Sequence, residues 1–458
     1  MSERRKSIHG QWTSRTVFIL AATGSAVGLG NIWKFPYITG ENGGGTFVLV
    51  YLVCIAMIGI PIMMAEIMLG RRGKQSPINT MAALAHDENR NPGWVSLGWL
   101  GVVAGFLILS YYSVIAGWAM SYVFRTAGGM FLGVTSDGVN GIFTDLVSDP
   151  ERLLAWHTIF MVMTMIVVAR GVKAGLERAV TFLMPLLFAL LIVIVIYAMT
   201  TGHFMQGVEF LFTFGPIDQE AVLTAMGHAF FTLSLGMGAI MVYGSYLSDK
   251  HSITQASFII AIADTCVALL AGLAIFPIVF ANGLEPGAGP GLIFQTLPIA
   301  FGHMQGGTLV GVVFFTLLVF AAWTSAISLI EPAVAWLVEN KGVNRIYASV
   351  WIGLATWFVG LGTVFSFNIW SDKTITIPFL FENKTFFDTL DYLTANIMLP
   401  LGGLFIAIFA AWVMKESSAR AELQTFDKVF KAWRFLVRYI TPVAVIIVFL
   451  WELEIISI

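Results

Sequence analysis

The sequence predicts an all-α protein that crosses a membrane about eleven times. Of its 458 residues, 57% are hydrophobic and only 11% are charged, and the mean hydropathy is +0.83. A soluble domain needs far more charge on its surface. Charge-poor runs of about twenty residues, the length that spans a bilayer as a helix, recur along the whole chain. We place these spans at 15–38, 43–70, 94–125, 152–169, 177–200, 221–247, 254–281, 304–338, 345–367, 389–414 and 435–456.

The distribution of basic residues predicts how the chain is oriented. When the spans are threaded alternately, the Lys and Arg residues gather on the side of the N-terminus. The exceptions are Lys34, Arg125, Arg152, Lys373 and Lys384. Because short cytoplasmic loops carry an excess of Lys and Arg, the N-terminus is expected in the cytoplasm. An odd number of spans then sends the C-terminus to the outside.

Several other classes are disfavoured by the motifs that the sequence lacks. It contains no HExxH or GxSxG motif, its seven histidines are scattered, and no glycine loop follows a strand as a phosphate site would require. We therefore predict that the chain is not an enzyme. Cys54 and Cys266 both lie in apolar spans, which argues against a disulfide framework or a cysteine metal site. The first apolar run is too long for a cleavable signal peptide.

Two spans carry matched polar interruptions. The first contains SAVGLGN at 25–31, and the sixth contains SLGMG at 234–238, with Thr232 just before it. Glycines in one span are most simply explained by close helix packing. Two spans broken at corresponding points of two halves instead indicate a binding site in the middle of the membrane. We predict that both helices are broken there.

A broken helix supplies the chemistry for such a site. Its freed backbone groups cannot remain unpaired in hydrocarbon, so the break must line a buried cavity. Carbonyl and hydroxyl oxygens suit an alkali cation, and the N-terminus of the following half-helix suits a carboxylate. A cation and an anionic group bound side by side raise the affinity for one another, which is a physical basis for coupling.

Long ordered motifs give the chain a family resemblance. They are GSAVGLGNIWKFPY at 24–37, ENGGGTFVLVY at 41–51, IPIMMAEIMLGRR at 60–72, SYYSVIAGW at 110–118, FFTLSLGMGAI at 230–240 and AAWTSAISLIEP at 321–332. The sequence resembles the neurotransmitter:sodium symporter family, in particular its bacterial amino-acid transporters with the leucine-transporter fold. The resemblance implies one transmembrane domain over 1–458. Its inverted-repeat halves of five helices would cover 1–200 and 221–414, with an extra C-terminal helix at 435–458.

The resemblance also implies a function. The expected activity is symport of a neutral, hydrophobic L-amino acid, large aliphatic or aromatic, with two sodium ions by alternating access. No chloride requirement, nucleic-acid partner or obligatory protein partner is expected. The expected location is the plasma membrane, which in bacteria is the inner membrane. A non-transporting amino-acid sensor and a channel-like protein of the same fold are the alternatives. A channel would need a continuous polar pore, whereas the polar groups cluster at one depth.

The family's binding residues map onto this chain by position. A first sodium site would use Ala26, Asn31, Thr232 and Asp264. A second would use Gly24, Val27, Ala321, Thr324 and Ser325. The substrate would contact Ala26, Leu29, Gly30, Ile108, Tyr112, Phe231, Thr232, Ser234, Met237, Ser325 and Leu329.

Four residues refine these expectations. Family members that carry amines place an aspartate at the position of Gly28, so glycine implies a substrate with its own carboxylate. Met237 is flexible and predicts a roomy pocket, although most methionines in helices are simply core. Asp264 supplies a fixed charge where animal members have asparagine and use chloride; a protonated aspartate in a helix contact is the alternative. Glu66 is expected to brace the unwound first helix.

The expected gates depart from the family pattern. At the outer gate, Lys34 replaces the usual arginine opposite Asp391 and gives a point charge rather than a bidentate fork. At the inner gate, His9 replaces an arginine and Glu339 an aspartate, so gating there would be weaker or pH-sensitive, unless His9 is merely solvated. Ser245, Tyr246 and Glu331 are expected to complete the inner network. Gly175 and Pro185 bracket a part of the fifth helix that is expected to unwind, unless Pro185 makes only a static kink. His228 is expected to be either a hydrogen-bonded core histidine or a proton carrier.

Overall fold

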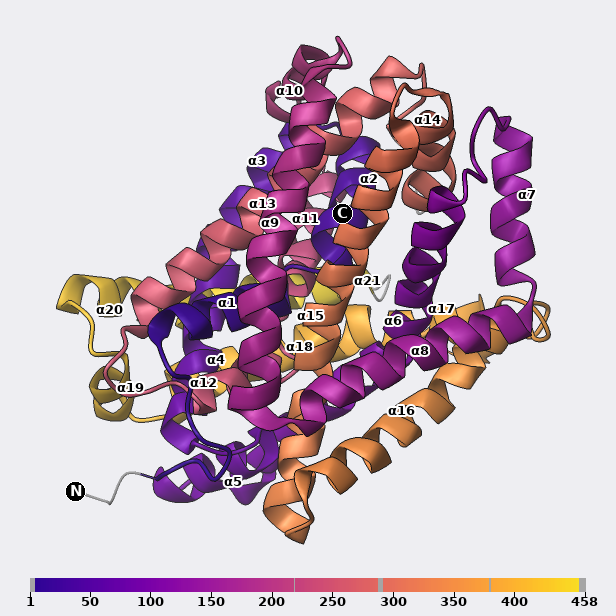
Figure 1. Ribbon diagram of the computed structural model, residues 1–458. Coiled ribbons are helices and arrows are strands. Elements are labelled where there is room, and N and C mark those ends of the chain that lie inside the picture. Colours follow the sequence, from indigo (N-terminus) through magenta and orange to yellow (C-terminus); the bar gives the residue numbers. More distant parts are fainter. Residues whose placement is uncertain (1–4, 218, 287–290, 379, 453–458) are drawn as a thin grey trace.

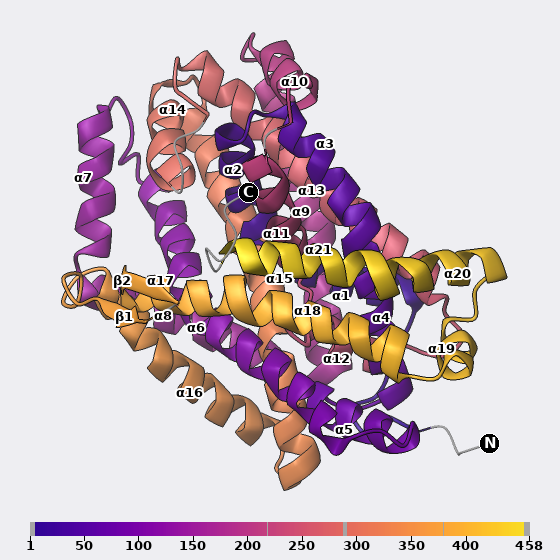
Figure 2. The ribbon, with the colours of Figure 1, turned by 180° about the vertical axis from the view of Figure 1, so that it is seen from behind.

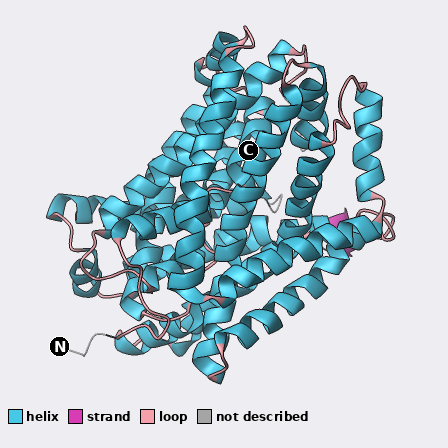
Figure 3. Ribbon diagram, in the orientation of Figure 1, coloured by secondary structure: helices cyan, strands magenta, loops and turns pink. Residues whose placement is uncertain are grey.

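The computed structural model describes residues 5–217, 219–286, 291–378 and 380–452. This part of the chain is almost entirely helical (Figures 1 and 3), as its composition predicts. Its α-helices are α1 Arg15–Ala26, α2 Phe35–Glu41, α3 Gly45–Cys54, α4 Ile60–Gly73, α5 Pro77–Asp87, α6 Val95–Ala127, α7 Ser136–Val147, α8 Pro150–Ala169, α9 Arg178–Met199, α10 Phe204–Phe212, α11 Gln219–Thr232, α12 Ala239–Ser245, α13 Ile253–Ala281, α14 Leu297–His303, α15 Gly307–Lys341, α16 Arg345–Ser366, α17 Phe386–Asp391, α18 Leu399–Ile408, α19 Glu416–Leu423, α20 Asp427–Phe435 and α21 Thr441–Glu452.

Several helices are extended by short segments of other helix types. The π-helical segments are Gly30–Lys34, Ile55–Gly59, Val172–Glu177, Leu292–Thr296, Tyr392–Met398, Phe409–Val413 and Leu436–Ile440, and a 3₁₀ turn covers Pro92–Trp94. Such segments occur frequently at functional sites and at changes of helix direction.

A small hairpin is the exception to the all-α prediction in the described ranges. Strand β1, Ile375–Ile377, pairs antiparallel with β2, Phe381–Lys384, with one irregularity in the register. The hairpin lies in the connection between α16 and α17. The hairpin is confined to this connection and does not change the arrangement of the helices.

The expected membrane spans are present, with two of them interrupted. Among the described residues, nine helices are long and apolar enough to cross a membrane. The first expected span is a bent pair, Arg15–Ala26 and Gly30–Glu41, whose two parts meet at 52°. The sixth expected span, 221–247, is divided between α11 and α12 by six residues without helical structure. Neither of its pieces is long enough to cross a bilayer alone.

The interrupted helices occupy the interior of the bundle (Figures 1 and 2). Helix α1 packs against α9, α13 and α15, and α12 packs against α4 and α15. The outer helices α8 and α16 lie side by side along one flank in both views. The buried position of α1 and α12 keeps the unpaired backbone groups of the breaks away from the lipid-facing surface.

Candidate functional site

The first helix is broken where the sequence predicts. Helix α1 ends at Ala26, and Val27 has an extended backbone conformation with ψ of 110°. The chain becomes helical again at Gly30. All of the residues from Ala21 to Ile32 are buried. The break is therefore enclosed by protein, as irregular backbone at membrane depth must be.

The break in the sixth span contains three residues with left-handed backbone. Gly236 and Gly238 have φ of 81° and 74°, which glycine adopts without a steric penalty. Ser234 has φ of 54°, an uncommon conformation for a residue with a side chain. Its hydroxyl donates a hydrogen bond of 2.7 Å to the carbonyl of Ser25 in the first span. This bond joins the two breaks.

The expected first sodium site is a compact cluster of polar groups. The Asn31 amide nitrogen donates to Thr232 Oγ1 at 3.1 Å and to Asp264 Oδ1 at 2.8 Å, and Thr232 Oγ1 donates to Asp264 Oδ2 at 3.0 Å. The Asn31 amide oxygen accepts from the Gly28 backbone at 3.0 Å. Ala26, the fourth expected member, is the last residue of α1 at this break. The cluster is buried and contains one carboxyl group.

The expected second sodium site brings together α1 and α15. Ser325 Oγ lies 3.4 Å from the Gly24 carbonyl oxygen and 3.1 Å from the Val27 carbonyl oxygen. Thr324 Oγ1 lies 3.1 Å from the Ala321 carbonyl oxygen. Ser325 therefore contacts Gly24 and Val27, and Thr324 also lies close to Gly24, since a Cβ atom on Gly24 would be 3.2 Å from Thr324 Cβ. Ala321 lies one turn before Thr324 on α15. Their oxygens are carbonyls and hydroxyls, which are hard donors suited to an alkali cation.

A small pocket lies against both clusters. Most of its lining belongs to the predicted substrate residues: Ala26, Leu29, Gly30, Ile108, Tyr112, Phe231, Ser234, Met237, Ser325 and Leu329. Gly28 also lines it, and a Cβ atom there would lie 2.6 Å from Ser325 Oγ and 2.8 Å from the Tyr112 hydroxyl oxygen. The space at Gly28 therefore excludes a side chain. Thr232 is a predicted substrate residue that does not line the pocket. It is bonded to Asn31 and Asp264 in the first cluster.

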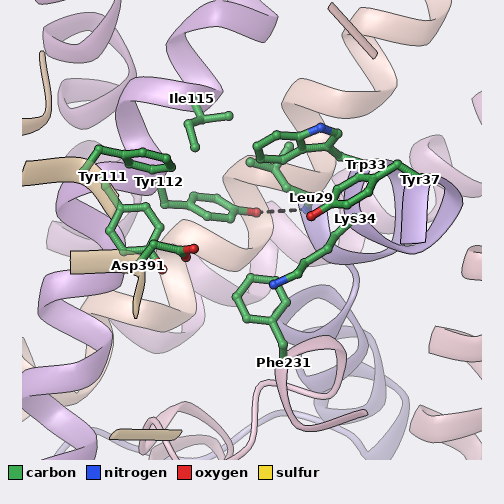
Figure 4. A pocket seen from close by; sticks show the side chains of 10 residues that line it. Leu29, Trp33, Lys34, Tyr37, Tyr111, Tyr112, Ile115, Phe231 and Asp391 are labelled. Atoms are coloured by element: carbon green, nitrogen blue, oxygen red, sulfur yellow. Dashed lines mark hydrogen bonds between the residues drawn. The ribbon is translucent and has the colours of Figure 1, made fainter. Parts of the chain in front are cut away.

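A second cavity, whose lining side chains are drawn in Figure 4, adjoins the pocket and shares Leu29, Tyr112 and Phe231 with it. We call it the outer cavity because it contains the residues of the expected outer gate. Tyr112 and Phe231 separate the two, and the Tyr112 hydroxyl oxygen accepts the Leu29 N–H at 3.2 Å. Lys34 and Asp391 both line the outer cavity.

The expected ion pair between Lys34 and Asp391 is not formed in the described part of the chain. The Lys34 ammonium instead lies 4.9 Å from the centre of the Phe231 ring, a cation–π contact. Both charged groups line the same cavity, and a single ammonium on a flexible stem has no fork that holds it on a carboxylate.

The expected inner network is closed. His9 Nε2 lies 3.1 Å from Glu339 Oε1, and both side chains are almost fully buried, so His9 is not a solvated terminal residue. The Tyr246 hydroxyl donates to Glu331 at 2.7 Å, and Glu331 also pairs with Arg345. Ser245, in contrast, donates to the carbonyl of its own helix rather than to this network.

Glu66 has a different partner from the one predicted. Its Oε1 accepts the backbone N–H of Gly236 at 2.5 Å, so it supports the break of the sixth span rather than that of the first. The prediction of its partner is wrong, because α4 packs closely against α12. The character of the role, a buried carboxyl that satisfies freed backbone groups, is the same.

Two further expectations concern the fifth span and His228. Gly175 lies in the π-helical segment Val172–Glu177 and Pro185 lies inside α9, so this span is helical here and its unwinding stays a prediction. His228 is buried between Phe35 and Tyr51, with ring centres 6.0 and 5.6 Å away. Neither of its ring nitrogens has a hydrogen-bond partner in the described residues, so the expected bonds are not formed.

Two serines complete the site and were not among the predicted site residues. Ser25 lines the inner pocket, its carbonyl accepts from Ser234, and its hydroxyl donates to Ser328 at 2.8 Å. Ser328 in turn donates to the Ser325 carbonyl at 2.7 Å. The sequence could have predicted Ser328, because it lies three residues after Ser325 and therefore on the same face of the helix.

Two interrupted helices that bring oxygen clusters and a buried pocket together in a membrane bundle define the architecture of a secondary transporter. Comparison with known proteins identifies the family. The model of the Sodium:neurotransmitter symporter family matches residues 9–130 and 148–457. The chain belongs to this family.

Similar proteins agree with this assignment. The chain is 39% identical over 453 residues to the uncharacterized sodium-dependent transporter YhdH of Bacillus subtilis, covering 98% of each chain. It is 33% identical to an uncharacterized sodium-dependent transporter of Haemophilus influenzae, covering 96% of this chain and 98% of the relative. The crystal structure of MhsT in complex with L-phenylalanine matches with a TM-score of 0.87 and 44% identity, covering 97% of this chain and 99% of that one. The chain is thus a multi-pass, sodium-dependent membrane transporter with the leucine-transporter fold, and not an enzyme.

Proposed function

We propose that this chain is a symporter that couples the uptake of a neutral, hydrophobic L-amino acid, large aliphatic or aromatic, to two sodium ions. The observation that carries the proposal is the contact of both oxygen clusters with one pocket through the two helix breaks. Ligands bound so close together raise each other's affinity.

The substrate class follows from the pocket chemistry. The backbone at Leu29 and Gly30, at the start of the second half of the first span, would receive the substrate carboxylate together with the Tyr112 hydroxyl. Gly28 leaves no side chain that could replace that carboxylate. The walls formed by Ile108, Met237 and Leu329 are apolar and suit a hydrophobic side chain. The L-phenylalanine bound by MhsT supports this class.

The two sodium ions would occupy different surroundings. The first would lie among Asn31, Thr232, Asp264 and the Ala26 carbonyl, next to the substrate carboxylate. The carboxylate of Asp264 would balance the added positive charge, so transport would not require chloride. The second ion would lie among the carbonyl and hydroxyl oxygens at the contact of α1 and α15. This cluster contains no carboxyl group.

The gates suggest how access alternates. In this proposal the contact between His9 and Glu339 is the closed inner gate, and Lys34 and Asp391 belong to the outer gate. Closing the outer cavity over a bound amino acid, and then unwinding the fifth helix between Gly175 and Pro185, would release the second ion and the substrate on the inner side.

The orientation and internal repeat are part of the same proposal. The excess of Lys and Arg on the N-terminal side would place that terminus in the cytoplasm and the C-terminus outside. Residues 1–200 and 221–414 would be the two inverted halves, each with one broken helix, and 435–458 the additional helix.

Uptake into proteoliposomes tests this function. With an inward sodium gradient, we expect accumulation of radiolabelled L-phenylalanine, no accumulation in a potassium gradient, and the same rate when gluconate replaces chloride. Binding without accumulation would identify a sensor instead. Conduction of sodium without any amino acid would identify a channel. Equal uptake in sodium and potassium would overturn the proposal.

A further inference from the structure

An apolar groove runs along the outer surface between α8 and α16 and shares no lining residue with the transport pocket. It leaves about 990 Å³ of unfilled space open to the surroundings. The α8 wall is formed by Thr158, Met161, Val162, Met165, Ile166 and Ala169, and the α16 wall by Ile346, Ser349, Val350, Gly353, Leu354 and Trp357. Several of these hydrophobic side chains are about half exposed, including Val162 at 52% and Leu354 at 51%.

The groove has the length of one bilayer leaflet. It extends along α8 from Thr158 to Ala169, which is about 17 Å at 1.5 Å per residue. The hydrocarbon core of a bilayer is about 30 Å thick, so one leaflet contributes about half of this. At one end the groove is closed by a hydrogen bond of 2.9 Å from Trp357 Nε1 to Thr158 Oγ1. A chain entering it must therefore come from the other end.

The open end of the groove is basic. Arg170 follows Ala169 directly, Lys173 lies three residues further in the next helical segment, and Arg345 precedes Ile346. Neither Arg170 nor Lys173 has an acidic partner among the residues that the structure describes, and both are exposed. Arg345 adds no free charge to this end, because its guanidinium pairs with Glu331 and donates through Nε to the Val168 carbonyl, and its Nη1 is buried. The positive charge that this end offers to a ligand is therefore that of Arg170, with Lys173 close to it in the chain.

One polar group inside the groove is also unpartnered. Ser349 is fully buried, lines the groove, and its hydroxyl has no hydrogen-bond partner among the described residues. Because this hydroxyl has no accessible surface, it does not contact a molecule in the groove, and Ser349 forms part of the groove floor.

We propose that the groove binds one acyl chain of an anionic phospholipid, whose phosphate lies against Arg170 at its basic end. The apolar walls suit the chain, the length suits one leaflet, and the charge suits the phosphate. The assignment to the inner leaflet rests on the proposed orientation of the N-terminus. Binding to the groove itself depends on neither that orientation nor the transport function.

Photolabelling of the purified wild-type protein tests this site. The probe is phosphatidylglycerol with a diazirine in one acyl chain, and labelled peptides are identified by mass spectrometry. We expect label to concentrate in peptides covering 158–169 and 346–357, and unlabelled phosphatidylglycerol to compete about fivefold better than phosphatidylcholine with the same chains. Even labelling of exposed α9 and α21, or equal competition by the two lipids, would overturn the proposal.

Matched variants separate the contributions of charge and space. Arg170→Gln should lower the labelling about fivefold, whereas Arg152→Gln at the opposite end of α8 should leave it unchanged. Ser349→Phe should fill the groove and remove the label, while Ser349→Ala keeps the space and most of the label. If Ser349→Phe does not fold, the comparison of labelling between Arg170→Gln and Arg152→Gln still tests the proposal. Efficient disulfide-linked dimers of Val350→Cys in membranes would show that a second copy fills the groove and would overturn the lipid assignment.

Discussion

The two oxygen clusters flank the same helix break, but they differ in charge and in what they connect. The first contains the Asp264 carboxyl group and links the broken first span to α11 and α13 through Asn31 and Thr232. The second is built from neutral oxygens and links α1 to α15. A site with a fixed charge next to the pocket suits an ion that binds with a carboxylate substrate. A neutral site between two helices suits an ion whose release allows those helices to separate.

Removing the charge of the first cluster should have the largest effect. Asp264→Asn keeps the shape and removes the carboxylate, at a cost of about 1.5–3 kcal/mol for a bond to a charged group. We expect ten- to hundredfold weaker sodium-dependent binding of L-phenylalanine, partly restored by chloride, measured by radioligand binding during sodium titration. The exposed carboxyl of Asp372 provides the control, since Asp372→Asn should change nothing. Wild-type sodium affinity in Asp264→Asn would exclude the first cluster as an ion site.

Adding one methyl group at the meeting point of the clusters should block the amino acid. In Gly28→Ala the new Cβ would approach the Ser325 and Tyr112 oxygens to within 3 Å. Overpacking of this kind costs about 1–3 kcal/mol. We expect L-phenylalanine affinity to fall about tenfold or more, measured by equilibrium binding at saturating sodium. Gly30→Ala should have a smaller effect, because its Cβ would meet the Phe231 ring at 3.2 Å, and this ring can move. A larger effect at Gly30 would contradict the assigned geometry.

Removing a neutral ligand from the second cluster should have a moderate effect. Thr324→Val is isosteric and deletes one hydroxyl, so the expected cost is about 0.5–1.5 kcal/mol. Sodium affinity should fall up to about tenfold, and chloride should have no influence, in contrast to Asp264→Asn. Thr316→Val is the matched control, since its hydroxyl also bonds to its own helix but lies away from the site. If both threonine variants weaken sodium equally, the second cluster is not an ion site.

The smallest effect should come from the surface anchor of the N-terminal segment. Arg5 bonds to Asp87 at 2.7 Å, and this guanidinium lowers the pKa of the Asp87 carboxyl below its ordinary value of 3.8. The ion pair therefore stabilises the anchored segment at neutral pH, and this contribution is lost as the pH falls through the lowered pKa. Because the pair is exposed, the gain is about 0.2–1 kcal/mol. Hydrogen exchange of residues 5–12 should be slightly faster in Arg5→Gln than in the wild type at pH 7, and this difference should shrink as the pH falls below 3.8.

The spans and both breaks could be predicted because hydropathy and glycine placement determine them locally. A bilayer demands long apolar helices, and the mixture of hydroxyls and paired glycines near Ser25 and Ser234 permits their interruption. The clusters followed from the resemblance, residue by residue, and the structure brings Asn31, Thr232 and Asp264 together as expected.

The side-chain partners at the gates were harder to predict. Whether Lys34 reaches Asp391 depends on the opening of the outer cavity, which sequence does not report. The partner of Glu66 depends on which break lies against α4. The hairpin at 375–384 has strands of only three and four residues, too short for a periodic pattern.

A sodium titration of L-phenylalanine binding tests the presence of two coupled ion sites most directly. The wild-type protein should show a cooperative dependence with a Hill coefficient above one, and Asp264→Asn and Thr324→Val should each reduce it towards one. A coefficient of one in the wild-type protein, or binding at full strength in potassium alone, would contradict the account.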